Sequence, residues 1–229
     1  MDWNNIIPHL EELRNRIIRA FLIYALVSVI MWFFHDYVIR FISQPVGKLY
    51  IFNVQDAFML RLKVSLMSAL FICLPYFVLE IWGFISPALY PNEKLAVGLI
   101  LISTLVLFYL GAFLSIFVIL PRAVVFLLSF SSGFQTIIGA NQYLDFIFWS
   151  TLIFGVLFEL PVAVGILARL GIINSKLLTK RRREMIVGIV IVAAVISPTV
   201  DAFSLIAMSL PLILLYEISI WVAKVVEKK

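Results

Sequence analysis

The sequence has few charged residues and few of the residues that build disulfides or metal sites. Charged residues make up 14% of its 229 residues, against about 25% in an ordinary globular domain. Its one cysteine, Cys73, has no partner in the chain and lies in an apolar run, so it is expected to be a small core residue. The net charge of +5 is scattered among apolar runs. This composition excludes a disordered chain, a disulfide scaffold and a nucleic-acid-binding protein.

The motifs of common catalytic and cofactor sites are also missing. No glycine-rich phosphate loop follows a strand, and no Gly-x-Ser-x-Gly, His-Glu-x-x-His or Cys-x-x-Cys pattern occurs. The two histidines, His9 and His35, flank the first apolar run, so a helix through that run would put them on opposite sides of a membrane. We therefore expect no catalytic residues, no metal and no cofactor, and a membrane enzyme has no residue set to support it.

Apolar residues are unusually abundant in the sequence. Apolar residues make up 63% of the chain, more than a soluble fold of this length can cover. Six runs approach the roughly 20 residues that a helix needs to cross a bilayer. We predict an all-α integral membrane protein, a single membrane domain over residues 1–229. Its six transmembrane helices are expected at about 16–36, 62–81, 95–121, 145–169, 184–197 and 202–223.

The last two of these helices are predicted to be short. Pro198 ends the fifth run after Ser197, because its ring removes a donor and disfavours a helix just before it. The turn 197–201 should then lie below the lipid headgroups, or the bilayer should thin there. The connections 37–62 and 122–144 are expected to form a cap over the outer ends of the helices.

The distribution of Lys and Arg predicts the orientation. With the N-terminus inside, the cytoplasmic segments hold 13 of these residues and the opposite side holds 5. The positive-inside rule then places both termini in the cytoplasm. A short polar start that leads directly into a span, with no small-residue cleavage site, argues against a removed signal peptide. The first helix is expected to stay in the membrane.

Glu159 is the acidic residue with the most unusual predicted position. It lies near the middle of the fourth run, in Phe158-Glu159-Leu160-Pro161. A carboxylate at that depth costs at least ~2.5 kcal/mol, so it should face the bundle interior or a water-filled cavity. Gly155 shares its face and would let another helix or water approach. The simpler alternative is a buried, protonated acid bonded to a neighbouring carbonyl.

Acids near the helix ends have structural explanations as well. Glu11, Glu12 and Glu93 fit the first turns of helices, where acids complement the helix dipole, with Pro8 near the first helical position. Asp201 fits a cap of the sixth helix.

Two further acids, Glu80 and Glu217, lie near the cytoplasmic ends of their helices, where snorkelling explains them. Neither receives a role.

Four segments together resemble the TatC family, the multi-spanning core of the twin-arginine protein translocase. The resemblance runs from about residue 8 to 224, and the family's six spans and cytoplasmic termini agree with those predicted above. The segments are His9–Arg14, Phe84–Tyr90 with Glu93, Phe158–Val162, and Ser197-Pro198 with Asp201-Ala202-Phe203.

The resemblance implies a receptor for the signal peptides of folded proteins bound for export. It assigns the paired arginines of those signals to Glu12 and Glu93 on the cytoplasmic face. A guanidinium presents a planar fork that a carboxylate can meet with two charge-assisted bonds, which lysine cannot match. The same motifs contain Arg14, Phe84, Leu89 and Tyr90.

The resemblance also implies partners and a location. Glu159 matches an intramembrane acid linked to contacts with the single-span proteins TatA and TatB, and the region of span five and Asp201 matches the place where TatB docks. Proline does not directly precede Asp201 here, a departure from the family pattern. The implied location is the cytoplasmic (inner) membrane, and the implied transport is driven by the proton-motive force. Self-association stays open, and no nucleic acid is implied.

An ion-coupled secondary transporter is the alternative function. Glu159 at mid-membrane and the prolines inside the even-numbered spans, Pro75, Pro161 and Pro211, are typical of transporters with broken helices.

Overall fold

The computed structural model describes residues 3–88, 90–130, 137–196 and 202–227. In these ranges the regular elements are helices, and one isolated bridge pairs Tyr50 with Gly139. The predicted all-α class is confirmed. The chain forms two compact units: unit 1 contains residues 1–105 and 137–144, and unit 2 contains residues 106–136 and 145–229.

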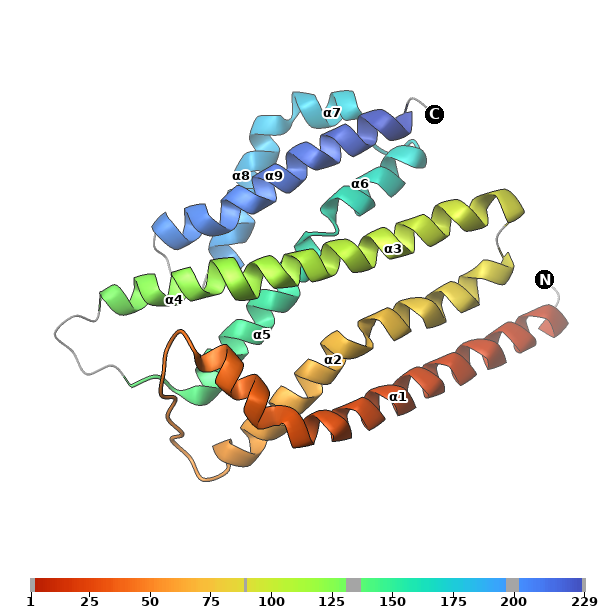
Figure 1. The fold of residues 1–229 in the computed structure, drawn as a ribbon. Helices are drawn as coiled ribbons and strands as arrows, with labels where there is room; N and C mark the ends of the chain where they lie inside the picture. Colours follow the sequence, from red (N-terminus) through yellow and green to blue (C-terminus); the bar gives the residue numbers. More distant parts are fainter. Residues whose placement is uncertain (1–2, 89, 131–136, 197–201, 228–229) are drawn as a thin grey trace. The chain divides into compact units, whose positions relative to one another are not determined.

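Unit 1 is built on a pair of long helices. Helix α1 (Trp3–Ser43) and helix α2 (Asp56–Ile85) run side by side in opposite directions (Figure 1). Val64, Ala69 and Cys73 of α2 are buried, which confirms that the cysteine is a core residue. A 3-10 turn (Ser86–Ala88) leads from the end of α2 toward helix α3 (Pro91–Leu114), whose first part belongs to unit 1.

Both helices extend beyond the apolar runs that predicted them. Because α1 continues to Ser43 and α2 begins at Asp56, the predicted connection 37–62 shrinks to residues 44–55. The turn before α2 is closed by the Asp56 carboxylate, which accepts hydrogen bonds from the backbone and side-chain N–H groups of Asn53 at 3.2 and 3.0 Å. At the other end, α1 starts at Trp3, so Glu11 and Glu12 do not lie in its first turn as predicted.

Backbone hydrogen bonds join the connection 44–55 to the segment before the fourth span. The Tyr50 N–H donates to the Ile138 carbonyl at 2.9 Å, and the Ala140 N–H donates to the Tyr50 carbonyl at 2.8 Å. The buried hydroxyl of Tyr143 donates to the Ile42 carbonyl at 2.8 Å. These bonds hold the two connections together within unit 1; a cap over the helix ends stays a prediction.

Unit 2 contains the remaining helices. The second part of α3 continues through a π-helical segment (Ser115–Ile119) into α4 (Leu120–Ser129). Most of α5 also belongs to unit 2, where α9 packs against α6, α7 and α8. Its core includes Phe154, Ala193, Met208, Leu212 and Ile220. The helices are α5 (Ala140–Leu157), α6 (Leu160–Arg169), α7 (Ser175–Lys180), α8 (Arg182–Ile196) and α9 (Ala202–Glu227).

Five helical segments among the described residues are long and apolar enough to cross a membrane, so the chain is a multi-spanning membrane protein. The predicted short fifth span corresponds to α8, which has 15 residues. The sixth helix is not short, contrary to the prediction: α9 has 26 residues and continues past its apolar run to Glu227. The five segments are His9–Ser43, Asp56–Ile85, Lys94–Ser129, Ala140–Arg169 and Met208–Glu227. A sixth span and a single membrane domain stay predictions.

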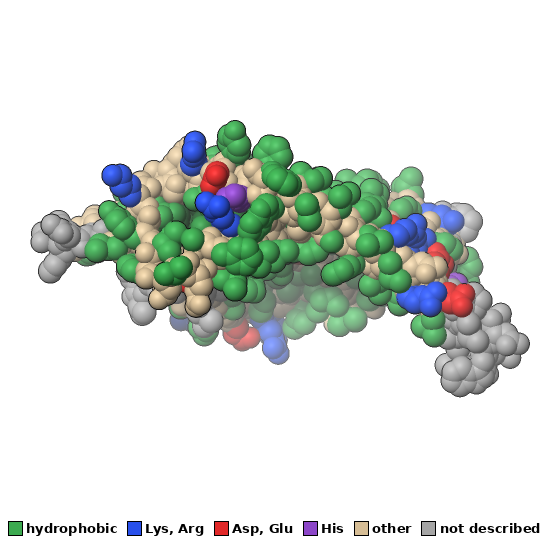
Figure 2. Space-filling model, turned by 90° about the horizontal axis from the view of Figure 1, so that it is seen from below, with side chains coloured by type: hydrophobic (Ala, Val, Ile, Leu, Met, Phe, Trp, Pro, Cys, Tyr) green, Lys and Arg blue, Asp and Glu red, His purple; other side chains and the backbone are tan. Residues whose placement is uncertain are grey.

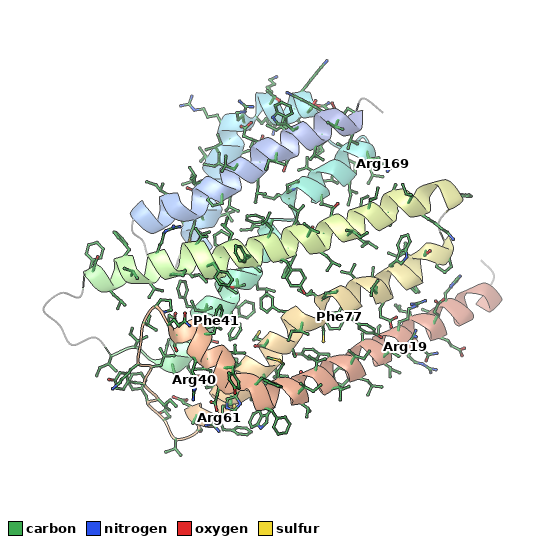
Figure 3. All side chains as sticks on the ribbon, in the orientation of Figure 1. Arg19, Arg40, Phe41, Arg61, Phe77 and Arg169 are labelled. Carbon is green, nitrogen blue, oxygen red and sulfur yellow. The ribbon has the colours of Figure 1, made fainter. Side chains whose placement is uncertain are left out.

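The surface has the charge pattern expected of membrane helices. On the face seen in Figure 2, charged side chains gather in two regions and apolar side chains cover the surface between them. On the α1–α2 pair, Arg19 lies toward one end, whereas Arg40 and Arg61 lie near the other (Figure 3). Such a separation leaves the middle of each helix to contact lipid.

Candidate functional site

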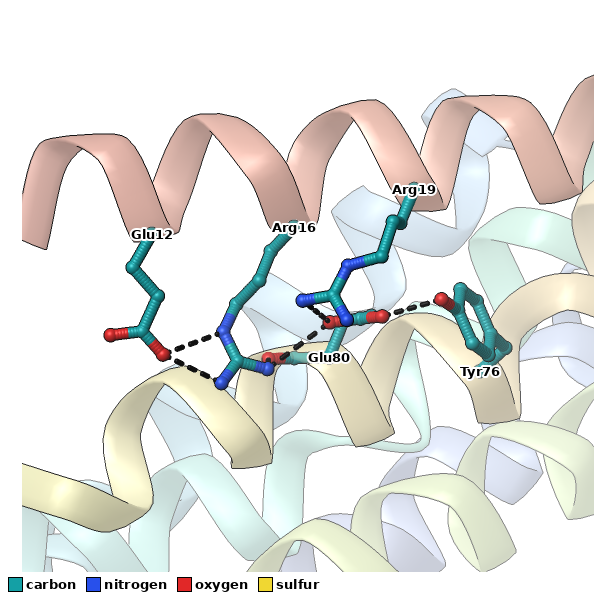
Figure 4. Close-up of polar contacts among 5 residues, drawn as sticks. All are labelled: Glu12, Arg16, Arg19, Tyr76 and Glu80. Carbon is teal, nitrogen blue, oxygen red and sulfur yellow. Dashed lines mark hydrogen bonds and ion pairs between the residues drawn. The ribbon is translucent and has the colours of Figure 1, made fainter.

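A network of charged side chains crosses from α1 to α2 in unit 1 (Figure 4). Arg16 donates to Oε1 of Glu12 from both Nη2, at 2.7 Å, and Nε, at 3.1 Å. Its third nitrogen, Nη1, donates to Oε2 of Glu80 at 3.1 Å. The guanidinium of Arg16 is therefore held between two carboxylates, one on each helix.

Glu80 is the most enclosed carboxylate of this network. Its Oε2 also lies 3.6 Å from Nη2 of Arg19, and its Oε1 accepts a hydrogen bond from the Tyr76 hydroxyl. The exposed fraction of the side chain is 13% for Glu80, 19% for Arg16 and 35% for Glu12. The network is thus most buried at Glu80 and opens toward Glu12.

Local sequence spacing explains how the network forms. Glu12 and Arg16, like Tyr76 and Glu80, are four residues apart, so each pair shares a face of its helix. Gly83 leaves room for the arginine on the α2 side, because a Cβ at this position would collide with Nη1 of Arg16. Burying the side of α1 that faces α2 brings the two pairs together.

An apolar groove adjoins the network between α1 and α2. It has a volume of about 250 Å³, with Arg16 and Glu80 in its wall. A second groove of about 270 Å³ continues along the same two helices and shares Ile17 and Phe77 with the first. The charged network and the apolar grooves therefore lie next to each other. The apolar lining of the first groove includes Leu13, Ile17, Phe77, Ile81 and Phe84.

The other predicted site residues are distributed around this end of unit 1. Arg14 is exposed and lies two residues from Glu12, on a different face of α1. Tyr90 is also exposed. Glu93 lies in the first turn of α3, which follows the end of α2 at the same end of unit 1 as the start of α1 (Figure 1). The side chain of Glu93, like all of Leu89, lies outside what the structure describes.

Glu80 and Arg16 are the residues that sequence reasoning missed. Glu80 received no role, yet it binds both arginines of the network. The signal was present in the spacing of four between Glu12 and Arg16 and between Tyr76 and Glu80. Glu217, the other acid without a role, pairs with Arg182 at 2.9 Å in unit 2.

Glu159 lies at a break in the helix of the predicted fourth span. Helix α5 ends at Leu157 and α6 begins at Leu160, with Glu159 as the residue before it. Pro161 explains the break, because it has no N–H to donate to the Leu157 carbonyl. The side chain of Glu159 is partly buried, with Oε1 shielded from solvent.

The space beside Gly155 is filled by the protein itself. We expected this glycine to admit another helix or water near Glu159, and the helix that approaches there is α3. The ring of Phe108 packs there so closely that a Cβ at Gly155 would lie 2.6 Å from its Cε2. Gly111 of α3 provides the reciprocal contact, against the Phe154 carbonyl and the Phe158 ring. Two glycines thus let α3 and α5 pack closely within unit 2.

Polar contacts also hold the end of α9. The Glu227 carboxylate accepts hydrogen bonds from the backbone N–H of Ser175 and, at 2.6 Å, from its hydroxyl. The buried hydroxyl of Tyr216 donates to the Leu178 carbonyl at 2.7 Å. These bonds attach α7 to α9. Asp201, predicted to cap α9 and to contact partners, lies outside the described residues.

Potential metal ligands do not cluster in the part of the chain that the structure describes: it contains no group of three or more His, Cys, Asp or Glu residues that could hold an ion. His9 is exposed near the start of α1. His35 is buried further along it, with Nε2 3.1 Å from the Asp36 carboxylate. What the structure describes at the end of the α1–α2 pair is a set of ion pairs beside an apolar groove.

Comparisons with known proteins match nearly the whole chain. Residues 8–211 match the family described as Sec-independent protein translocase protein (TatC). The TatC protein of Koribacter versatilis is 32% identical over 235 residues, covering 98% of this chain and 87% of the relative. That of Carboxydothermus hydrogenoformans is 34% identical over 229 residues, covering 98% and 94%.

Solved structures agree with the sequence comparison. A crystal structure of the twin arginine translocase receptor TatC superposes with a TM-score of 0.76 at 31% identity, covering 95% of this chain and 99% of that one. A second, solved in DDM, also gives 0.76, at 32% identity and with 93% and 98% covered. The chain therefore belongs to the TatC family of Sec-independent protein translocase proteins.

Proposed function

We propose that this chain is the signal-peptide-binding core of a twin-arginine translocase, and that Glu12 and Glu93 bind the paired arginines of export signals. One observation carries the proposal: Glu12 already accepts two hydrogen bonds from a guanidinium while its side chain remains 35% exposed. Charge-assisted bonds of this kind favour arginine over lysine, because only the guanidinium offers a planar set of donors.

The surroundings of Glu12 suit a signal that combines arginines with an apolar segment. The groove lined by Leu13, Ile17 and Phe84 lies beside the charged network. A chain held by its arginines at Glu12 could place its next apolar side chains there, where their burial is favourable. In this proposal Arg14, Leu89 and Tyr90 contribute to the same surface.

The proposed topology puts this site at the cytoplasmic face of the inner membrane. Six spans are proposed, with α8 as the short fifth one and with both termini in the cytoplasm. The supporting observation is the bias of Lys and Arg, 13 on the proposed inner side and 5 on the outer. The joined connections around Tyr50 and Ile138 would then lie outside as a cap.

The proposed partners are single-span proteins of the TatA and TatB type, in a translocase that uses the proton-motive force. Glu159 and Asp201 are the proposed polar contacts, and the break at Glu159 leaves backbone that does not follow a regular helix. Ion-coupled transport by this chain is not proposed, because the family is one of protein translocases. Of the three prolines that suggested it, Pro75 and Pro211 lie inside continuous helices.

Photocrosslinking tests the recognition proposal. A peptide with two consecutive arginines before an apolar segment, carrying a photoreactive group, is added to the full chain in lipid nanodiscs. Glu12→Gln combined with Glu93→Gln should abolish the crosslink and leave the chain monodisperse. Glu11→Gln is the matched control, because Glu11 is an exposed acid next to Glu12. Undiminished crosslinking to the double variant would refute the assignment.

A further inference from the structure

Arg16 occupies the carboxylate that the proposed function assigns to an arginine of the export signal. Its Nη2 and Nε lie 2.7 and 3.1 Å from Oε1 of Glu12. We propose that Arg16 is an autoinhibitory residue: an internal guanidinium that an incoming arginine must replace on Glu12, while Glu80 retains Arg16. This inference rests on the proposed function of Glu12 and adds two residues to it.

The geometry divides the donors of Arg16 between the two acids. Nε and Nη2 face Glu12, and Nη1 faces Oε2 of Glu80 at 3.1 Å and its backbone carbonyl at 3.4 Å. Arg16 can therefore release Glu12 without losing every ionic partner. An isolated cation in a half-buried site would be costly, and Glu80 removes that cost.

Burial indicates which partner moves. Glu80 is 13% exposed and is further fixed by the Tyr76 hydroxyl and by Arg19. Glu12 is 35% exposed, and both of its bonds to Arg16 use the single oxygen Oε1. Rotation of the Glu12 side chain toward solvent is thus the smallest change that exchanges one guanidinium for another.

The exchange imposes one cost on every cation that binds Glu12. A ligand gains at Glu12 only the difference between its own bonds and the two that Arg16 gives up. An arginine of the peptide can match both bonds, whereas the ammonium of lysine lacks the planar fork. The bonds that Arg16 gives up are the same for both ligands, so Arg16 weakens both by one factor and the preference for arginine comes from Glu12.

Loss of positive charge alone would also strengthen the binding of both peptides. Removing Arg16 takes one cation away from the site, which should favour arginine and lysine peptides alike, since both carry the same charge. Only the exchange predicts that Glu80 affects binding through Arg16. The dependence of the Glu80 effect on Arg16 is therefore the measurement that separates the exchange from simple electrostatics.

The test measures the affinity of the full chain in nanodiscs for two fluorescent peptides, identical except for twin arginine or twin lysine. Arg16→Gln should tighten binding of the twin-arginine peptide by roughly two- to fivefold, the range of a partly exposed ion pair. Binding of the twin-lysine peptide should tighten by the same factor, because both peptides are freed from the same competitor. Unchanged or weaker twin-arginine binding would overturn the proposal.

Arg182→Gln provides the matched control. It breaks the Arg182–Glu217 pair, which has a 2.9 Å separation and lies in unit 2. This variant should leave both dissociation constants unchanged. Size-exclusion profiles and thermal unfolding show that the variants compared are folded.

Glu80 is tested in both backgrounds. In the presence of Arg16, Glu80→Gln should weaken twin-arginine binding, because Arg16 then depends on Glu12. In the Arg16→Gln background the same change should have no effect. An equal loss in both backgrounds would show that Glu80 contacts the peptide directly, and would contradict the exchange.

A separate result would refute the proposed function itself. If Glu12→Gln keeps full affinity for the twin-arginine peptide, Glu12 is not its site and both proposals are wrong. If Glu12→Gln abolishes binding but Arg16→Gln does not tighten the binding of the twin-arginine peptide, only the exchange is wrong.

Discussion

Phe108 of α3 packs against the backbone of Gly155 in α5 so closely that a Cβ on Gly155 would lie 2.6 Å from Cε2 of the ring. Cζ of the same ring would lie 2.8 Å from that Cβ. A methyl group added here would force the ring or the helix to move. This contact makes the packing of α3 on α5 within unit 2 sensitive to a single carbon atom.

Gly155→Ala should therefore destabilise the chain by about 1–3 kcal/mol, the usual cost of overpacking a core. Thermal unfolding in detergent measures the effect as a lower midpoint. Gly188→Ala is the control, because nothing lies within 4 Å of a Cβ at that position and alanine favours a helix. Equal midpoints for both variants would show that Phe108 adapts without cost.

The attachment of α7 to α9 through Ser175 and Glu227 gives a second prediction. Ser175→Ala removes the hydroxyl that donates to Glu227 at 2.6 Å, which should cost about 0.5–1.5 kcal/mol. Hydrogen exchange should become faster across 172–180 and stay unchanged in α1. Ser103→Ala is the control, since its exposed hydroxyl bonds only its own helix at Leu99. Unchanged exchange across 172–180 would mean that other contacts hold α7.

Crosslinking from α5 tests the proposed partner surface near Glu159. Val156 is 57% exposed, whereas Phe154, two residues earlier, is 1% exposed. A photoreactive residue at 156, or at the half-buried Leu152, should crosslink to TatA- or TatB-type helices in membranes that contain them. The same group at 154 should react within the chain only. Crosslinks from 156 confined to this chain would argue against partner docking there.

Cysteine labelling tests the proposed orientation. The native Cys73 is buried at 2% exposure, so it contributes little background to a membrane-impermeant thiol reagent. Lys176→Cys should be labelled only from the cytoplasmic side and Lys48→Cys only from the opposite side; both lysines are exposed. Labelling of both from one side would contradict the predicted topology.

Apolar runs predicted the presence of the long helices but not their ends. The length of an apolar run reflects the thickness of the lipid layer and not the length of the helix. Helix α1 continues past His35-Asp36 to Ser43 because helical hydrogen bonding does not stop at a charged residue. For the same reason α9 passes Lys224 and ends at Glu227, where Ser175 provides donors. Composition therefore identifies membrane helices better than it locates their ends.

The candidate site was only partly predictable. Glu12 and Phe84 were identified from motifs, and both lie at the network or its groove. The bond from Arg16 to Glu80 joins residues 64 positions apart, so only the packing of α1 on α2 reveals it. Spacing along one helix can suggest a pair, but it cannot show a second carboxylate on a neighbouring helix.

The link between Tyr50 and the 138–140 segment is made entirely by main-chain groups. Most residue types could therefore replace Tyr50 without breaking it, although proline could not donate the bond to Ile138. Gly139 is the exception to this tolerance, because a Cβ there would lie 2.8 Å from the Phe52 ring. Insertions or deletions within 44–49 would shift the register and remove both bonds at once. Among related sequences, substitutions in this region should consequently be far more common than insertions or deletions.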